Sequence, residues 1–283
     1  MHAQGLDDFI RSVLAEDLGV SGDVTSQATI PAGSIAVGHI VARTAGSISG
    51  LAIAARVFLA MDPDIEVEAL VEDGVSVPAG TRLLGISGPA RTVLAAERVA
   101  LNLLGHLSGV ATATNALVRE VSGTDAQILD TRKTLPGLRA LQKQAVVHGG
   151  GANHRMGLYD AVLIKDNHIA VVGSVTGAVR RAREHVGPSM DVEVEVERVS
   201  DVEPAIEAGA NIVLLDNMPP DEMREAVAIN RGRCLLEASG GITLESVRSV
   251  AETGVDRISV GWVTHSAPSL DVALDFVVES AGD

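Results

Sequence analysis

The spacing of hydrophobic and polar residues changes along this chain. Over residues 7–18, apolar side chains recur every three or four positions and end at Gly19, which predicts a helix with a glycine C-cap. Short alternating segments then follow up to residue 88, with one helical pattern among them over residues 53–62. Alternation separated by turn-rich links is typical of antiparallel strands. The first part of the chain is therefore predicted to be a small α+β domain.

A different pattern follows a long helical stretch over residues 91–121, which we expect to be broken near Gly105 or Gly109. Six apolar runs now alternate with helical patterns, and alternation of this kind predicts βαβ units and a parallel sheet. The runs are AQILD, DAVLIKD, MDVEVEV, NIVLLDN, CLLEASGG and DRISVGW, and the helical patterns lie at 138–147, 172–186, 200–208, 220–230 and 243–253.

Each of these six runs ends in polar side chains or glycine. The active sites of α/β barrels are built at the C-terminal rim of the strands, whereas an open doubly wound sheet gathers ligands at one switch point. The pattern therefore favours an incomplete (open) α/β barrel of the TIM type. We expect the N-terminal α+β sandwich domain over residues 1–108, the barrel over 109–267, and a C-terminal amphipathic helix over 268–283 that closes the barrel or returns to the first domain.

Composition narrows the functional classes. The chain has 283 residues, a formal net charge of −15 and 2% aromatic residues. Binding to nucleic acid needs a basic face and usually stacking aromatics, so a nucleic-acid partner is not expected. Neither is binding to an anionic membrane, and no apolar run or opening segment is typical of a membrane span or a signal peptide. With one cysteine, Cys234, expected in the core, the chain is interpreted as a cytoplasmic globular protein.

Positive charge is concentrated in residues 130–168. Only three of the 22 Lys and Arg residues are lysines, and Lys133, Lys143 and Lys165 all lie in this stretch. Arg132 precedes Lys133, and the pair His154 and Arg155 lies between the two outer lysines. Because Arg grips carboxylates bidentately, so many cations on one rim suggest a ligand with carboxylate groups.

Glycines at two later strand ends indicate a phosphate. Ser239, Gly240 and Gly241 join a strand to a helix whose start we place at Thr243, and Gly261 ends the next strand. Backbone N–H groups and a helix N-terminus bind anions, and the last two strands of a barrel are the usual phosphate site.

Two acidic residues, Glu195 and Asp216, end adjacent strands of the predicted barrel. They suit ribose hydroxyls or a Mg²⁺ ion that arrives with phosphates. Alternation places Glu193, Glu195 and Glu197 on the same face, so spacing does not select one of them. A second interpretation remains open, in which the acids and cations neutralise one another.

Several blocks of this sequence resemble the quinolinate phosphoribosyltransferase family. They are EDLGVSGDVTS, ERVALNLLGHLSGVAT, DTRKTLPGLRALQKQAV, GGGANHRMGLYDAVLIKDNH, LLDN, EASGGI and VGWVTHS. The resemblance as a whole runs from about residue 7 to 270. The resemblance implies transfer of the phosphoribosyl group of phosphoribosyl pyrophosphate (PRPP) to quinolinate, with decarboxylation to nicotinate mononucleotide in NAD biosynthesis. It also implies Mg²⁺ bound with PRPP, and a homodimer whose assembly beyond the dimer is left open.

The resemblance assigns roles residue by residue. It implies that the dicarboxylate is held by Thr131, Arg132, His154, Arg155, Lys165 and, from the other subunit, Arg98. Lys133 and His265 are implied near the pyrophosphate, and Glu195 and Asp216 near the ribose or Mg²⁺. The 5′-phosphate is implied to contact Ser239, Gly240, Gly241 and Gly261, and Val260 and Trp262 are counted with the residues that bind substrate. Trp262 stands where the family usually has a small residue, and the sequence does not say whether its ring enters the site.

Three other functions stay open at this point. One is a barrel lyase that uses Lys165 as a Schiff-base nucleophile. Another is a molybdenum-transport-associated homologue of the same fold with a different acceptor. The third is a binding module without catalysis.

Overall fold

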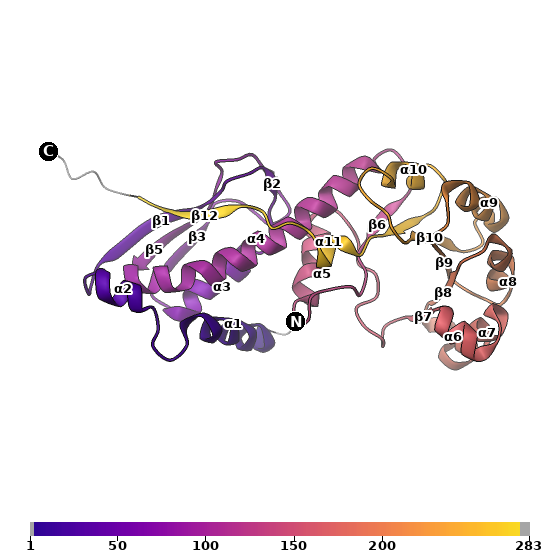
Figure 1. Cartoon of the computed structure of the whole chain (residues 1–283), viewed down its shortest axis with the longest axis horizontal. Helices are drawn as coiled ribbons and strands as arrows, with labels where there is room; N and C mark the ends of the chain where they lie inside the picture. The colour runs from indigo at the N-terminus through magenta and orange to yellow at the C-terminus, as the bar shows by residue number, and fades with distance from the viewer. Residues whose placement is uncertain (1–2, 278–283) are drawn as a thin grey trace. The chain divides into compact units, whose positions relative to one another are not determined.

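The structure is a computed structural model that describes residues 3–277, and the chain forms two compact units (Figure 1). The first unit comprises Met1–Ala113, Ala140–Gly149 and Ala267–Asp283. The second comprises Thr114–Arg139 and Gly150–Ser266. Residues 140–149, which the sequence placed in the barrel domain, thus belong to the first unit.

The first unit is built on a four-stranded antiparallel sheet. Its strand order is β12 (Val272–Phe276), β1 (Ile35–Ala42), β5 (Arg82–Pro89) and β3 (Glu66–Ala69). One face of the sheet is apolar and buried, as alternation requires, with Ile40 on β1 opposite Leu84 on β5. The other elements are α1 (Ala3–Leu18), α2 (Val24–Thr29), β2 (Gly46–Ser47), α3 (Leu51–Met61), β4 (Ser76–Val77) and most of α5 (Arg139–His148).

Helix α4 (Ala90–Glu120) is continuous, so the predicted break near Gly105 or Gly109 was wrong. Instead, the two glycines allow the backbone of residues 268–270 to approach the helix closely. A Cβ atom at Gly109 would lie 2.2 Å from the Pro268 carbonyl oxygen, and one at Gly105 would lie 2.9 Å from that of Leu270. A glycine surface on the helix therefore lets this later segment pass against it.

The predicted C-terminal helix over 268–283 was also wrong where the structure describes it. Val272–Phe276 forms strand β12, which pairs with β1 from Ala42↔Val272 to Gly38↔Phe276. Arg43 and Asp275 add an ion pair between the two strands. Pairing along an open sheet edge outweighs the local helical pattern here. Residues 278–283 lie outside the described residues.

The second unit contains six parallel strands in the order β6 (Gln127–Leu129), β11 (Arg257–Ser259), β10 (Leu235–Ser239), β9 (Ile212–Asp216), β8 (Val192–Val196) and β7 (Val162–Ile164). They are the six apolar runs of the sequence. Between the described residues of β6 and β7 there is no strand pairing, so the barrel is open, and the predicted fold class is confirmed. The connecting elements are α6 (Asp166–Val172), α7 (Val175–Val186), η1 (Gly187–Ser189), η2 (Val199–Asp201), α8 (Val202–Glu207), α9 (Pro220–Asn230), α10 (Val247–Ala251) and α11 (Trp262–His265).

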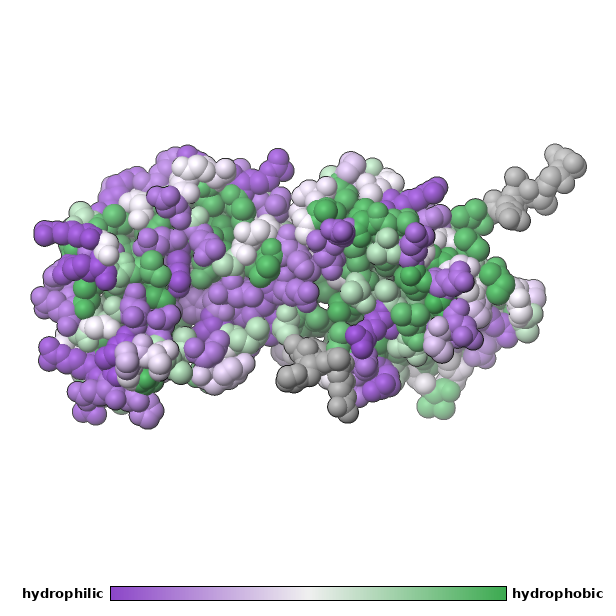
Figure 2. Space-filling model, turned by 180° about the vertical axis from the view of Figure 1, so that it is seen from behind, coloured by the Kyte–Doolittle hydropathy of each residue, from purple (hydrophilic) through white to green (hydrophobic). Residues whose placement is uncertain are grey.

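The surface of the protein mixes hydrophilic and hydrophobic residues. Figure 2 shows hydrophilic and hydrophobic residues interspersed over the face that it draws. Among residues 3–277, no helix combines the length and the apolar character needed to cross a membrane.

Cys234 is half-buried, and burial together with Asp256 raises the pKa of its thiol to about 11, so the thiol is protonated and unreactive at neutral pH.

Candidate active site

A cavity of about 530 Å³ opens at the C-terminal ends of the strands in the second unit, a size typical of small-molecule sites. Every residue that lines it belongs to this unit. The lining residues are Thr131, Arg132, Lys133, His154, Arg155, Leu163, Lys165, Glu195, Leu214, Asp216, Asn217, Glu237, Ser239, Gly240, Gly241 and Ser259. The cavity therefore joins the cationic stretch to the acidic strand ends.

The loop after β6 is held at both of its edges. The Thr131 hydroxyl accepts a hydrogen bond from the Lys133 amide at 2.9 Å, and the buried Thr264 hydroxyl donates to the Lys133 carbonyl at 2.7 Å. These bonds fix the backbone from which the side chains of Arg132 and Lys133 extend. The Arg132 Nε atom is buried and has no hydrogen-bond partner among the described residues.

The loop that carries Arg155 is closed by one carboxylate. Asp160 accepts hydrogen bonds from the amides of Met156 (2.6 Å) and Gly157 (2.9 Å), and the Arg155 guanidinium donates to the Ala161 carbonyl at 3.0 Å. Burial and the nearby charge of Arg132 lower the pKa of the Arg155 guanidinium. Two guanidinium groups held so close repel each other, and an anionic ligand between them would relieve that repulsion.

Arg139 links these two loops, a role that the sequence did not suggest. Its guanidinium donates to the Thr134 hydroxyl at 2.9 Å, to the Met156 carbonyl at 3.2 Å and to the Arg132 carbonyl at 3.4 Å. Arginine has five donors in a planar fork and can make such a three-way link. Arg139 therefore fixes the spacing of the two cationic loops without lining the cavity.

The acidic side of the cavity comes from β8 and β9. Glu195 forms an ion pair with Lys165, whose side chain is 47% exposed. Asp216 accepts a hydrogen bond from its neighbour Asn217 at 2.7 Å. Part of the neutralisation that the sequence left open is thus observed at the pair of Glu195 and Lys165. Both carboxylates face the cavity and can serve hydroxyl groups or a metal ion.

The glycine turn after β10 has the left-handed backbone that suits glycine. Gly240 has φ +95°, and a Cβ atom on it would lie 2.2 Å from the Asn217 side-chain oxygen, so no other residue fits there. The predicted helix start at Thr243 was wrong. Helix α10 begins at Val247, because residues 243–246 form a turn in which the Ser246 hydroxyl accepts from the Thr243 amide. The backbone of the turn itself, rather than a helix terminus, lines the cavity.

Gly261 lies beside the cationic loop. A Cβ atom at this position would lie 3.0 Å from Lys133 Cδ and 3.6 Å from the His265 ring, so glycine lets the Lys133 stem pass. The Trp262 indole donates to the Ile242 carbonyl at 3.0 Å and does not line the cavity. Its ring therefore fastens the glycine turn rather than crowding the site.

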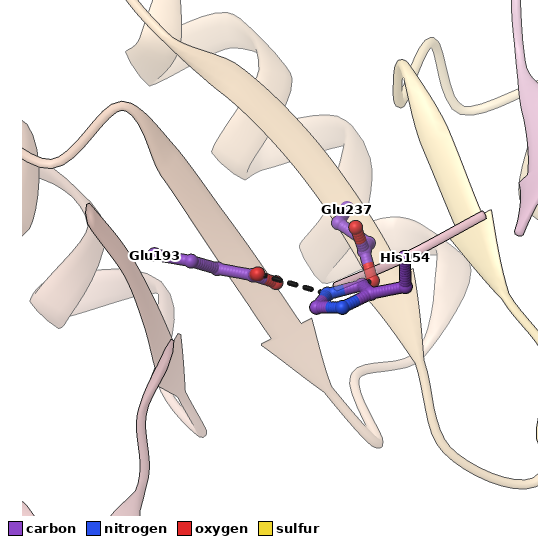
Figure 3. Close-up of side chains that lie close together, drawn as sticks. All are labelled: His154, Glu193 and Glu237. Atoms are coloured by element: carbon purple, nitrogen blue, oxygen red, sulfur yellow. Dashed lines mark ion pairs between the residues drawn. The ribbon is translucent and has the colours of Figure 1, made fainter. Parts of the chain in front are cut away.

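His154 reaches beneath the cavity into a buried acidic cluster that we call the His154 cluster, formed by His154, Glu193 and Glu237 (Figure 3). The imidazole Nε2 lies 2.9 Å from Glu193 and 3.6 Å from Glu237, which extend from β8 and β10. The other ring nitrogen, Nδ1, accepts the Arg155 amide at 2.7 Å. With Nδ1 accepting, Nε2 carries the proton that points to Glu193, and a metal ion would have to displace that proton to bind there.

The comparisons with known proteins cover nearly the whole chain. Residues 23–108 match the family described as "Quinolinate phosphoribosyl transferase, N-terminal domain", and residues 110–275 match "Quinolinate phosphoribosyl transferase, C-terminal domain". The chain belongs to the quinolinate phosphoribosyltransferase family. Both units carry the match, so the membership does not rest on the barrel alone.

Its relatives are similar in sequence and in structure. The nicotinate-nucleotide pyrophosphorylase [carboxylating] of Mycobacterium leprae is 46% identical over 276 residues, which are 95% of this chain and 96% of that protein. A probable enzyme of the same name from Bacillus subtilis is 42% identical over 97% of this chain and 94% of its own length. The crystal structure of NadC from Streptococcus pyogenes has a TM-score of 0.93 at 37% identity and covers 98% of this chain and 99% of that one.

The cavity of this family member gathers most of the residues predicted from the sequence. Eleven of them line it: Thr131, Arg132, Lys133, His154, Arg155, Lys165, Glu195, Asp216, Ser239, Gly240 and Gly241. Val260, Gly261, Trp262 and His265 are not among the lining residues, although Gly261 backs onto Lys133. Arg98 belongs to the first unit, on an exposed position of α4, and its guanidinium lies 3.7 Å from the Glu97 carboxylate.

Besides the apolar Leu163 and Leu214, three polar lining residues were missed or left without a role. Asn217 and Ser259 carry no distinctive spacing, since each is a single polar residue at a strand end. Glu237 was noted at a strand end, but nothing in the sequence shows that it is buried. Two buried carboxylates around one histidine come from three separate segments, so only the folded barrel reveals the His154 cluster.

Proposed function

We propose that this chain transfers the phosphoribosyl group of PRPP to quinolinate and releases pyrophosphate and CO₂, giving nicotinate mononucleotide for NAD biosynthesis. It is then a pentosyltransferase. One observation carries the proposal: Arg132, Arg155 and Lys165 line a single cavity together with the acidic residues Glu195 and Asp216. A dicarboxylate needs cationic side chains, and the hydroxyl groups of a ribose phosphate need acidic ones, so one cavity with both kinds suits the two substrates.

Quinolinate binding follows from the cationic wall. Two adjacent carboxylates on a planar ring match two guanidinium forks and one ammonium, and each charged hydrogen bond contributes about 1.5–3 kcal/mol. The unpartnered Nε of Arg132 and of Arg155 are donors that a bound anion would satisfy. Lys165 would leave its pair with Glu195 for a substrate carboxylate, since an exposed ion pair is worth only about 0–1 kcal/mol. Thr131 and His154 complete this wall.

PRPP would occupy the other side of the cavity. The turn of Ser239, Gly240 and Gly241 would hold the 5′-phosphate, with Val260, Gly261 and Trp262 supporting it from the next strand. Lys133, with His265 behind it, would face the pyrophosphate. Glu195 and Asp216 would hold the ribose hydroxyls or Mg²⁺, and this pair of cavity-facing carboxylates from adjacent strands fits the ion. Bound there with PRPP, Mg²⁺ would neutralise charge on the leaving pyrophosphate.

The reaction needs no nucleophile from the protein. The quinolinate ring nitrogen attacks the anomeric carbon of the ribose as the bond to pyrophosphate breaks. Lys133 stabilises the charge that develops on the leaving group. The arginines hold the ring nitrogen in line with that carbon, and such positioning supplies much of the acceleration. The nitrogen of the adduct is cationic and accepts the electron pair that is left when the neighbouring carboxylate departs as CO₂.

We further propose a cytoplasmic homodimer in which Arg98 of one subunit reaches the quinolinate of the other. The exposed guanidinium of Arg98 supports this role, because its ion pair with Glu97 is long, at 3.7 Å. An Arg98→Ala variant should remain dimeric and lose most activity. Mixing it with an inactive Lys133→Ala variant should restore part of the turnover, and mixed dimers without any recovery would contradict the shared site.

The function is tested by a turnover assay with quinolinate, PRPP and Mg²⁺. Nicotinate mononucleotide, pyrophosphate and CO₂ should appear in equal amounts. Folded protein that binds PRPP but forms no product would show that the acceptor is wrong.

A further inference from the structure

Glu237 lines the cavity, yet the roles above do not use it. Its side chain on β10 is fully buried, with an exposed fraction of 0%. Neither carboxylate oxygen has a hydrogen-bond partner of normal geometry among the described residues, and the Ser259 hydroxyl on β11 gives it only partial relief. Taking an unpaired carboxylate ion out of water is costly, and a buried acid avoids this cost by keeping its proton. Glu237 is therefore suited to be a neutral carboxylic acid at the edge of the ligand space.

The surroundings of Glu237 explain why it holds its proton. His154 has one N–H to offer, because its Nδ1 accepts the Arg155 amide, and it gives that N–H to Glu193 at 2.9 Å. Glu237 lies farther from the same nitrogen, at 3.6 Å. Burial, reinforced by the charge of Glu193, raises the pKa of Glu237 to about 7, against the opposing effects of His154 and of Ser259 and Arg257 on β11.

The reaction proposed above requires a proton at one defined place. When the C–C bond to the departing carboxylate breaks, its electron pair stays on the ring carbon next to the cationic nitrogen, and that carbon must gain a proton to give the product. We propose that Glu237 is the acid that donates this proton. The carboxyl O–H bond breaks, a C–H bond forms, Glu237 becomes a carboxylate, and water reprotonates it as the product leaves. The inference rests on the proposed function and names a further residue for it.

Other groups of the cavity are poorer donors. The arginines are poorer donors, since a guanidinium does not give up its proton in proteins. In the complex proposed above Lys165 is engaged with a substrate carboxylate, and the Nε2 proton of His154 is engaged with Glu193. An acid whose pKa lies near the working pH is protonated in about half of the molecules and transfers its proton readily.

The test separates the two products in time. Rapid-quench single turnovers with PRPP, Mg²⁺ and quinolinate labelled in the departing carboxylate follow pyrophosphate and CO₂ together. In Glu237→Gln, pyrophosphate should appear at close to the wild-type rate while CO₂ release slows by about 10²–10⁴-fold, because without a donor the electron pair recaptures CO₂. Release of both products in step at wild-type rates would overturn the inference.

Glu193→Gln is the matched control, since it changes a carboxylate of the same cluster that does not line the cavity. Its overall turnover should fall, but pyrophosphate and CO₂ should stay in step. If both variants separate the two products equally, Glu237 acts only through the charge of the cluster and the inference fails.

A measurement on the wild-type enzyme tests the role of Glu237 as proton donor even if Glu237→Gln does not fold. The rate of CO₂ release relative to pyrophosphate release should fall about tenfold per pH unit above pH 7, since the acid must be protonated to act. A flat ratio from pH 6 to 9 would overturn the inference. Wild-type protein that releases no pyrophosphate would instead refute the proposed function.

Discussion

Glu193 and Glu195 are two residues apart on strand β8, and each forms an ion pair with a side-chain nitrogen, yet the two pairs differ in their surroundings. Glu195 pairs with Lys165, whose side chain is 47% exposed. Glu193 pairs with His154, and their side chains are 3% and 9% exposed. Water and substrate can replace one partner of the open pair, whereas the bond within the closed pair is almost out of contact with water. Similar groups thus serve ligand exchange at the mouth of the cavity and fixed geometry beneath it.

The largest effect is expected from breaking the closed pair. His154→Ala leaves Glu193 and Glu237 buried without the imidazole, and removing one partner of a buried pair typically costs about 3–5 kcal/mol of folding free energy. Urea unfolding should show this loss. Lys165→Ala is the control and should cost no more than about 1 kcal/mol. Equal losses in the two variants would contradict the distinction between the pairs.

The closed cluster should also make stability depend on pH. An unfolded Glu releases its proton near its ordinary pKa of 4.5, whereas folded Glu237 holds it to about 7. Between these values the folded state binds more protons, so the free energy of unfolding should fall as pH rises, by at most about 1.4 kcal/mol per unit. Above pH 7 the decline should end. Glu237→Gln should show a shallower decline than wild type in urea titrations from pH 4.5 to 8, and identical slopes would count against the buried acid.

The open pair should matter for binding instead. Lys165→Gln removes one charged hydrogen bond to the substrate, so the KM for quinolinate should rise by roughly 10- to 100-fold. The midpoint of urea unfolding should hardly change, because the pair is exposed. Steady-state kinetics with quinolinate as the varied substrate measures this. A large loss of stability with an unchanged KM would reverse the roles given to the two pairs.

The smallest effect concerns the edge of the site. Trp262→Phe removes the hydrogen bond to the Ile242 carbonyl and should cost about 1 kcal/mol of stability. Turnover should stay near wild type, since Trp262 does not line the cavity. If the KM for PRPP changed more than tenfold, the ring would have a direct role in phosphate binding.

The comparison also shows how far the sequence could lead. The six apolar runs predicted the six strands of the open barrel. A parallel strand that is buried on both faces has a nearly continuous apolar sequence, and such a sequence is easy to recognise. Eleven site residues followed from the resemblance and from strand ends. Strand β12 could not be predicted, since its pairing with β1 joins segments more than 200 residues apart, as in Ala42↔Val272. The role of Glu237 depends on burial, which alternation on β10 does not reveal.

The central claim is that the cationic wall binds quinolinate, and calorimetric titration of Arg155→Ala tests it most directly. Arg155 is anchored through Ala161 and is not part of the acidic wall, so its loss should weaken quinolinate binding by at least about 100-fold. Binding of PRPP with Mg²⁺ should stay within about threefold of wild type. Undiminished quinolinate binding, or an equal loss of both ligands, would contradict the account.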